Sequence, residues 1–352
     1  MTGGPAQLQG RTMANTIRQA RLHGPGDMRI DEVPFPAMHD EDVLIEVAAC
    51  GICGSDLGFH RNGGIRPDRE PMAMGHEFSG VISAVGPRVE RYAPGMRVVV
   101  NPMANGAMIG CGSDDGAFAR TIRVRDVNRA PILHEVAAHV PMDVAALAEP
   151  LAVSLHAVNR SRAVEGETAL VLGAGAIGLG IVAMLKQRGV KHVAVADMSE
   201  RRLAIAATLG ADLVINPARD DVWETLARVH GSVPTFFGTR AAATQLIFEN
   251  TGVPSVLQDA VAHARDTARI TVASVYKEPM LFDFTLLQVK EIELIGTMCY
   301  PREFPDAVAW LASRTAEAAA MISHRFALDE IDAALRTAAD ATASAKVMIM
   351  PG

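Results

Sequence analysis

The sequence predicts an α/β protein with two parts, a β-rich first third and a doubly wound parallel sheet after it. Short apolar runs bounded by glycine and proline recur in residues 42–101. From Thr168 onward, strand-like and helix-like segments alternate, which is the pattern of a parallel sheet with helices on both faces. The pattern Gly173-x-Gly175-x-x-Gly178 directly follows the first strand-like segment of that alternation.

Length and composition are those of an ordinary globular protein. The 352 residues allow about two domains, and hydrophobic residues make up 49% against 21% charged residues. The net charge of −7 and the lack of a dense Lys/Arg block argue against a nucleic-acid partner or an anionic membrane surface. No apolar run reaches the length of a membrane span, and residues 11–21 lack the apolar core of a signal peptide. The four cysteines are too few for a disulfide scaffold, so we expect a reducing, cytoplasmic setting.

The first part should be built mainly from strands. The expected strands are residues 42–47, 78–85 and 96–101. Strands at this spacing, with turn residues between them, suggest a small barrel or sandwich. The pattern changes at Glu149-Pro150, because a proline suits the first turn of a helix, which we expect to continue to Asn159.

The second part should alternate strands and helices. Its expected strands are residues 169–172, 192–196, 212–215, 245–249, 269–274 and 293–296. Its helices are expected to begin near Ala176, Ser199, Arg219 and Val253. The end of the chain reads as helix, helix and strand at 305–312, 328–338 and 345–350, and this segment could return to the first part.

The glycines Gly173, Gly175 and Gly178 have the context of a dinucleotide-binding turn, since they follow an apolar strand and open a helix. The first glycine permits the tight turn, the second lets the backbone approach a pyrophosphate, and the third lets helix and strand pack closely. Ala176 and Ile177 lie at the start of that helix, where free N–H groups attract the anion. A glycine-rich loop without a ligand is the alternative interpretation.

Asp197, at the end of the second strand of this part, predicts NAD as the cofactor. An acid at this place accepts hydrogen bonds from the ribose hydroxyls and repels a 2′-phosphate. Arg201 and Arg202 lie just beyond it. They indicate either a solvated helix face near the adenine or a 2′-phosphate site, which would imply NADP. The carboxylate of Asp197 favours NAD.

Two short segments of the first part could supply the ligands of a metal ion, Cys50-Gly51-Ile52-Cys53 and Gly75-His76-Glu77. Zinc takes sulfur, nitrogen and oxygen ligands, and a catalytic zinc needs three protein ligands and an open position. Because Glu77 directly follows His76, both side chains reach one point only if the chain turns at Gly75. Taken singly, such residues are more commonly a small buried thiol and a hydrogen-bonded imidazole.

A redox pair is the other interpretation of Cys50 and Cys53. We expect this motif to follow a strand in a β-rich part rather than to open a helix of a βαβ unit, which disfavours a redox role. No second cysteine pair accompanies the motif, so a four-cysteine structural zinc site is excluded.

Several motifs in a fixed order carry a resemblance to a known family. They are Gly51-Ile52-Cys53-Gly54-Ser55-Asp56, Gly75-His76-Glu77-Phe78-Ser79-Gly80, Gly95-Met96-Arg97-Val98, Glu149-Pro150-Leu151-Ala152-Val153 and the dinucleotide turn with Asp197. From about Ala20 to its end, the chain resembles the zinc-dependent medium-chain alcohol dehydrogenases. It is most similar to the branch that includes sorbitol, threonine and butanediol dehydrogenases. The resemblance implies a GroES-like β-barrel catalytic domain, residues 13–152 and 299–352, and a Rossmann NAD-binding domain, residues 153–298.

The resemblance also implies a set of zinc ligands. Cys53 and His76 would bind the ion, and Glu77 would be the third ligand or exchange with water. Glu149 would bind the ion directly or through its water, although an acid at a helix start is also an ordinary N-terminal charge. Many relatives hold a second zinc with four cysteines, whereas the corresponding lobe here has only Cys111. We therefore expect one catalytic zinc per subunit and no structural zinc.

Further roles follow from the same resemblance. Ser55 would hydrogen-bond the substrate oxygen and pass its proton outward, and Asp56 would accept a hydrogen bond from His76. Relatives often carry a histidine two residues after this aspartate, where this chain has Gly58, so His60 is the nearby candidate for the outer relay. Cys50 would be a buried, inert thiol.

These features predict reversible oxidation of a secondary alcohol or polyol by NAD to a ketone or aldehyde, with zinc lowering the pKa of the alcohol. The candidate pocket residues are Phe59, Met103, Met108, Met298 and Tyr300. The alternatives are a zinc-free NAD(P)H-dependent quinone or enone reductase on the same scaffold and a non-catalytic NAD-binding protein. The resemblance implies a homodimer or homotetramer, in which residues 292–298 could form an edge strand that pairs across subunits.

Overall fold

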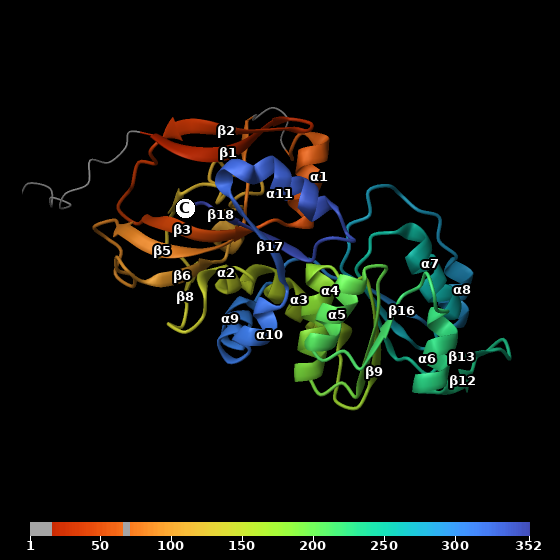
Figure 1. Cartoon of the computed structure of the whole chain (residues 1–352). Helices are drawn as coiled ribbons and strands as arrows, with labels where there is room; N and C mark the ends of the chain where they lie inside the picture. Colours follow the sequence, from red (N-terminus) through yellow and green to blue (C-terminus); the bar gives the residue numbers. More distant parts are fainter. Residues whose placement is uncertain (1–15, 66–70) are drawn as a thin grey trace, which may run out of the picture.

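The computed structural model describes residues 16–65 and 71–352, which form two lobes that lie side by side (Figure 1). The first lobe contains the strands coloured red to yellow together with the blue C-terminal strands. The second lobe contains the segments coloured green to teal. The expected start of the first domain, residue 13, lies outside the described residues.

A sheet of seven strands forms the body of the first lobe, in the order β17-β18-β3-β5-β6-β8, with β7 paired to β3. Its strands are β3 (Val43–Gly51), β5 (Glu77–Val85), β6 (Arg97–Val100), β7 (Thr121–Val124), β8 (Leu133–Glu135), β17 (Ile322–Ala327) and β18 (Lys346–Met350). The three strands expected from the sequence correspond to β3, β5 and β6. A second sheet, in the order β2-β1-β4, was not predicted; it contains β1 (Thr16–Gly24), β2 (Asp27–Pro34) and β4 (Met72–Ala73).

The C-terminal strand returns to the first lobe, as the sequence led us to expect. β18 pairs antiparallel with β3, so that Met348 lies opposite Gly51 and Ile349 lies opposite Cys50. This register brings the start of β18 beside the cysteine motif.

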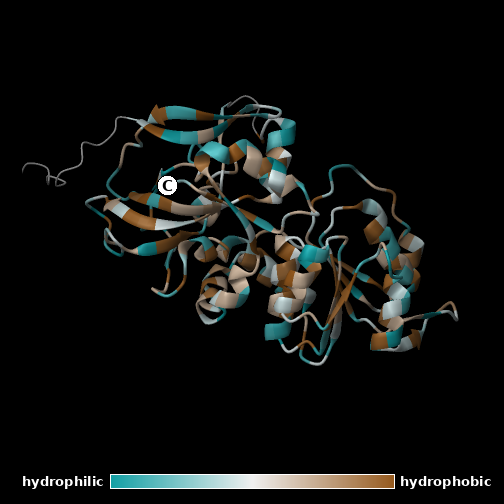
Figure 2. Ribbon diagram, viewed as in Figure 1, coloured by the Kyte–Doolittle hydropathy of each residue, from teal (hydrophilic) through white to brown (hydrophobic). Residues whose placement is uncertain are grey.

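Six parallel strands form the sheet of the second lobe, in the order β11-β10-β9-β14-β15-β16. They are β9 (Thr168–Leu172), β10 (His192–Ala196), β11 (Leu213–Ile215), β14 (Leu246–Glu249), β15 (Arg269–Val272) and β16 (Glu293–Gly296), and each overlaps a predicted strand. Figure 2 shows hydrophobic residues along this sheet, as expected for strands covered on both faces. The strand order reverses between β9 and β14, and the crevice at the carboxyl ends of such strands is the usual ligand site.

The helices of the second lobe are α4 (Ala176–Gln187), α5 (Glu200–Thr208), α6 (Val222–His230), α7 (Pro254–His263) and α8 (Phe284–Val289). The first four begin close to the predicted starts. The sequence analysis did not predict α8 or the hairpin of β12 (Ser232–Pro234) and β13 (Arg240–Ala242).

The helix α3 (Ala148–Ser161) joins the two lobes and packs against α4 and α9. One hydrophobic core runs from Val99 of β6 through Leu151 of α3 to Val171 of β9. The two lobes are therefore joined by one continuous hydrophobic core. The remaining helices are α1 (Gly54–Asn62), η2 (Ala104–Gly106), α2 (Met142–Ala145), α9 (Phe304–Ser313), α10 (Thr315–Ala319), η3 (Leu328–Glu330) and α11 (Ile331–Ala339).

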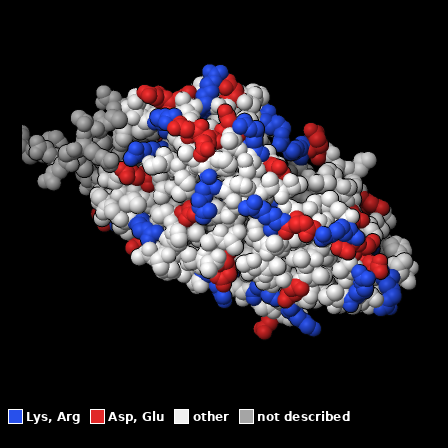
Figure 3. All heavy atoms as spheres, in the orientation of Figure 1, with Lys and Arg blue, Asp and Glu red and all other residues white. Residues whose placement is uncertain are grey.

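The surface carries both signs of charge. Figure 3 shows Lys and Arg side chains interspersed with Asp and Glu over the face in view. Within the described ranges, every helix is too short or too polar to cross a membrane.

Candidate active site

Three side chains from two separate segments meet in the first lobe. One ligand atom from each of Cys53, His76 and Glu77 lies within 4.8 Å of the other two. Cys53 directly precedes α1, whereas Glu77 begins β5 and His76 precedes it. Gly75 turns the chain with a φ of +92°, and a Cβ atom there would approach Phe118 to 2.7 Å. The turn that the sequence required at Gly75 is therefore present.

The two cysteines of the motif lie in different surroundings. Cys53 is the N-cap residue of α1, a helix that was not predicted, although the motif comes at the end of β3 in the β-rich lobe, as expected, and is not part of a βαβ unit. This helix was not predicted from the sequence, because Gly54 and Gly58 lie in it and glycine disfavours helix interiors. Cys50 is fully buried, and its burial raises the pKa of its thiol well above the usual value. A thiol with a raised pKa is a poor nucleophile, which argues against a redox pair and agrees with the inert role expected of Cys50.

The imidazole of His76 faces a buried carboxylate. Its Nδ1 atom lies 3.6 Å from Oδ1 of Asp56, while Oδ2 of Asp56 accepts a hydrogen bond of 2.8 Å from the Cys53 N–H. The distance of 3.6 Å is longer than a hydrogen bond, so the expected bond between His76 and Asp56 is not formed in this structure. Burial opposes the charged imidazole, but Asp56 and Cys53 raise the pKa of His76 well above its usual value. Burial also raises the pKa of Asp56 to about 6.

A second carboxylate, Glu149 in the first turn of α3, lies beside this group. Burial raises the pKa of Glu149 to about 7; His76 lowers it and the negative charge of Glu77 raises it. Tyr300 faces Glu149, and burial followed by the Glu149 charge raises the pKa of the tyrosine hydroxyl. Glu149 therefore interacts electrostatically with His76 and Glu77, while Glu77 is the carboxylate in the compact group of three.

Lys346, at the start of β18, was not among the residues predicted for the site. Its side chain is buried, pairs with Oε2 of Glu77 and donates a hydrogen bond of 2.9 Å to the carbonyl of Ile52. Gly51 makes room for this pair, because a Cβ atom there would clash with Glu77 Oε2 and approach Lys346 Cε to 2.9 Å. A lone lysine at the head of the apolar run Val347-Met348-Ile349-Met350 was the available signal.

The two residues expected in the proton path lie on α1. Ser55 is exposed and lies two positions after Cys53, whereas His60 is half-buried further along the helix. Residues five positions apart on a helix point to different faces. Within the part of the chain that the structure describes, no hydrogen bond joins Ser55 to His60. The role of His60 therefore stays a prediction.

The dinucleotide turn has the geometry that its glycines predict. β9 ends at Leu172, Gly173 has a φ of +90°, and α4 begins at Ala176. A Cβ atom at Gly178 would clash with the carbonyl oxygen of Gly173, so glycine is required for this close packing of helix and strand. Asp197 ends up beside the turn, where its carboxylate accepts a hydrogen bond of 2.7 Å from the Ala174 N–H.

The solvated-face interpretation of Arg202 is wrong. Its side chain is mostly buried, and its Nε donates a hydrogen bond of 2.7 Å to the carbonyl of Ser344 in the first lobe. One of its terminal nitrogens lies 4.0 Å from Oδ2 of Asp197. Nearby, Ser199 donates a hydrogen bond of 3.0 Å to the carbonyl of Thr342. The start of α5 is thus hydrogen-bonded to the segment that leads into β18.

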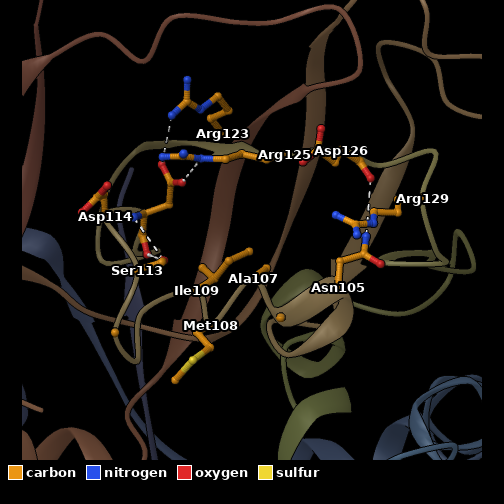
Figure 4. A pocket seen from close by; sticks show the side chains of 13 residues that line it. Asn105, Ala107, Met108, Ile109, Ser113, Asp114, Arg123, Arg125, Asp126 and Arg129 are labelled. Atoms are coloured by element: carbon orange, nitrogen blue, oxygen red, sulfur yellow. Dashed lines mark hydrogen bonds and ion pairs between the residues drawn. The ribbon is translucent and has the colours of Figure 1, made fainter.

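The five predicted pocket residues lie in different surroundings. Tyr300 lies at Glu149, whereas Met298 is exposed and Phe59 packs against the core of the first lobe. Met103 packs against the shared core, with its sulfur 3.8 Å from that of Cys111. Met108 lines a pocket of about 360 Å³, shown in Figure 4, whose lining residues do not include the three members of the compact group.

The pocket in Figure 4 is lined by residues 105–115 and by residues 123–129 at the end of β7 and beyond it. Arg125 pairs with Asp115 at 2.8 Å, and Arg123 lies 4.0 Å from the same carboxylate. Ion pairs across this segment therefore connect it to β7 and the residues that follow.

Comparisons with known proteins agree with this geometry. The alcohol dehydrogenase GroES-like domain matches residues 39–134, and the zinc-binding dehydrogenase domain matches residues 176–313. Sorbitol dehydrogenase of Rattus norvegicus is 31% identical over 339 residues, covering 90% of this chain and 91% of that protein. (R,R)-butanediol dehydrogenase of Neisseria gonorrhoeae is 31% identical over 344 residues, covering 90% and 93%.

Solved structures show the same fold. That of 2R,3R-butanediol dehydrogenase from Bacillus subtilis superposes with a TM-score of 0.83 at 27% identity, covering 96% of this chain and 100% of that one. An alcohol dehydrogenase from E. coli CFT073, complexed with NADH, superposes with a TM-score of 0.81 at 27% identity and the same coverage.

Fold and site together define an oxidoreductase of the zinc-binding dehydrogenase class. The chain belongs to the zinc-dependent medium-chain alcohol dehydrogenase family. The family, the fold class and the enzyme class expected from the sequence are confirmed.

Proposed function

We propose that this chain catalyses reversible hydride transfer between a secondary alcohol or polyol and NAD, using one catalytic zinc ion per subunit. The product is the corresponding ketone or aldehyde. The observation that carries the proposal is the meeting of Cys53, His76 and Glu77, with ligand atoms within 4.8 Å of one another. The sorbitol and butanediol dehydrogenases among its relatives support a polyol or secondary alcohol.

The residues fit a zinc ion. Sulfur, imidazole nitrogen and carboxylate oxygen are the ligand types of a catalytic zinc site, and such a site needs three of them. Because Nδ1 of His76 points toward Asp56, its other ring nitrogen is left for the ion. Cys53, His76 and Glu77 would hold the ion, with Glu149 beside it as a direct or water-mediated partner. A bound zinc supplies the Lewis acidity that eases loss of the alcohol proton.

The chain's own residues would manage that proton and the substrate. Ser55, exposed two positions after Cys53, would accept the proton from the substrate oxygen and pass it outward. Asp56 would keep the His76 ring oriented. Tyr300, buried against Glu149, would close one wall of the site.

For the cofactor we propose NAD. Gly173, Gly175, Ala176, Ile177 and Gly178 would cradle its pyrophosphate at the start of α4. Asp197, beside the turn, would accept hydrogen bonds from the adenosine ribose. Arg202 is bonded to the first lobe, so it would steady Asp197 rather than bind a 2′-phosphate.

We also propose the domain division 13–152 with 299–352 against 153–298, supported by the pairing of β18 with β3. A homodimer or homotetramer is supported by β16, which ends the order of the parallel sheet and exposes Leu294. The four free cysteines support a reducing, cytoplasmic setting, and the single cysteine in residues 106–116, Cys111, supports one zinc ion rather than two.

The test combines metal analysis with a substrate screen. Diols, sugar alcohols, amino alcohols and aromatic alcohols are offered with NAD and with NADP to zinc-loaded protein, and zinc is counted per chain. We expect one zinc and NAD reduction with a secondary alcohol or polyol. Activity without zinc would favour a quinone or enone reductase, and tight binding of zinc and NAD without turnover would favour a non-catalytic NAD-binding protein.

A further inference from the structure

We propose that Lys346 is a positioning residue that keeps Glu77 an exchangeable partner of the metal and so preserves an open coordination position for the substrate. This inference rests on the proposed function, in which Cys53 and His76 hold zinc. It concerns a residue that does not itself touch the ion or the substrate.

The pair of Lys346 and Glu77 is buried rather than a surface contact. The side chain of Lys346 is 3% exposed and that of Glu77 is 1% exposed. Two charges at such depth are stabilised only by each other and by further hydrogen bonds. The ammonium has one further bond, to the carbonyl of Ile52 at 2.9 Å. Glu77 is thus the anion that compensates this lysine.

The backbone holds the lysine in place. Its N–H donates a hydrogen bond of 3.1 Å to the carbonyl of Met321, and β18 pairs with β3 at Gly51. The absence of a side chain at Gly51 leaves the space that the ion pair occupies. The turn before Lys346 is bonded to the second lobe through the carbonyls of Thr342 and Ser344. The backbone of β18 and the space at Gly51 therefore place the ammonium group of Lys346 beside Glu77.

Two cations compete for one carboxylate in this arrangement. Glu77 belongs to the group with Cys53 and His76, and the same side chain is paired with Lys346. A positive charge fixed beside the site also repels the metal ion. Both effects weaken the hold of Glu77 on zinc, which lets water or an alcohol take its place. Without the lysine, Glu77 would have only the zinc to compensate its charge and would close the site.

The test compares two variants. Lys346→Met replaces the charged side chain with an uncharged one of similar length, and Lys290→Met is the matched control. Lys290 is also buried, but it binds the carbonyls of Val261, Ala262 and Ala264 at the end of α7. Zinc affinity is measured on metal-free full-length protein by competition with a chelator. We expect Lys346→Met to bind zinc at least about tenfold tighter and Lys290→Met to match the wild type. Lys346→Arg keeps the charge and should also bind zinc as the wild type does.

Steady-state kinetics supply a second readout. In Lys346→Met the substrate has to displace a firmly held Glu77, so KM should rise about tenfold while kcat changes less. In a Glu77→Gln background the lysine has no carboxylate to hold, so Lys346→Met should tighten zinc binding much less than it does with Glu77 present, through the lost repulsion alone. Should Lys346→Met fail to fold, Lys346→Gln retains a donor for the Ile52 carbonyl without the charge and should show the same direction of change.

The outcomes separate the inference from the function on which it rests. Unchanged or weaker zinc binding by the uncharged variants overturns the role of Lys346 and leaves the zinc site intact. A wild-type protein that binds no zinc overturns both.

Discussion

The dinucleotide turn and the proposed metal site are built in opposite ways. The turn consists of consecutive residues of the second lobe: β9 ends at Leu172, glycines follow, and α4 begins at Ala176. The proposed metal site gathers side chains from the residue before α1, the start of β5, α3 and the start of β18. At the turn, backbone N–H groups and the missing side chains of glycines form the site. At the proposed metal site, buried charged side chains form it.

This difference decides what a mutation does in each lobe. At the turn, the limiting quantity is room for the backbone, so an added methyl group should act on packing and on the cofactor. At the metal site, the limiting quantity is charge, so a change of side chain should act on metal binding with little effect on the sheet. The following predictions test that contrast.

Loss of a metal ligand should have the largest effect. We expect Cys53→Ala to lose its zinc and to lower turnover at least ~10³-fold, which corresponds to about 4 kcal/mol of transition-state stabilisation. Because Cys53 lies at the partly exposed start of α1, the urea midpoint should change little. Zinc content and turnover are measured on the same preparations.

Cys50→Ala is the control within the same motif. Cys50 is buried in the core of the first lobe and is outside the compact group of ligands. It should keep its zinc and lose stability through the small cavity left behind. Loss of zinc in Cys50→Ala, or full activity in Cys53→Ala, would show that the ligands are misassigned.

A methyl group in the dinucleotide turn should act on the second lobe alone. Gly178→Ala would force a Cβ atom against the carbonyl of Gly173, so we expect a loss of about 1–3 kcal/mol in the free energy of unfolding together with weaker NAD binding. Gly175→Ala has open space and should weaken NAD binding without destabilising the fold. Zinc content should be normal in both. Equal destabilisation by the two changes would refute the packing role of Gly178.

The same contrast explains which parts of the fold and of the site could be predicted from the sequence. The parallel sheet and the turn depend on neighbouring residues, so periodicity and glycine spacing were sufficient to predict them. The helix α1 was missed because Gly54 and Gly58 disfavour a helix, although the N-cap bonds between Cys53 and Asp56 stabilise it. Lys346 was missed because no local pattern reveals which carboxylate lies opposite a distant lysine. The proposed metal ligands rest on family motifs rather than on spacing alone.

Asp197 should control the choice of cofactor. Asp197→Gly removes both the ribose acceptor and the repulsion of a 2′-phosphate, so the preference for NAD over NADP should fall about 10- to 100-fold in kcat/KM. Asp212→Asn is the control, since Asp212 pairs with Lys186 away from the turn, and it should leave the preference unchanged. A wild-type enzyme that prefers NADP would contradict the role of Asp197.

The pKa of a histidine is shifted in opposite directions in the two lobes, and this difference gives the smallest expected effect. Asp56 helps to raise the pKa of His76 in the metal site. In the second lobe, burial followed by the charge of His192 lowers the pKa of His230 to about 4. An unfolded histidine has a pKa of about 6.5. Between these values the unfolded chain binds the extra proton, so stability is complete above the unfolded pKa and falls as the pH drops toward 4.

His230→Gln should remove this dependence. His230 is partly exposed, so solvent screening reduces its share to about 1 kcal/mol of unfolding free energy between pH 7.5 and pH 5. The measurement is urea unfolding of metal-free wild type and variant across this range. The variant keeps a side chain able to bond Thr244, whose hydroxyl lies 2.7 Å from Nδ1 of His230. Parallel pH profiles for the two proteins would mean that His230 is as easily protonated in the folded lobe as in the unfolded chain, and the contrast with His76 would be lost.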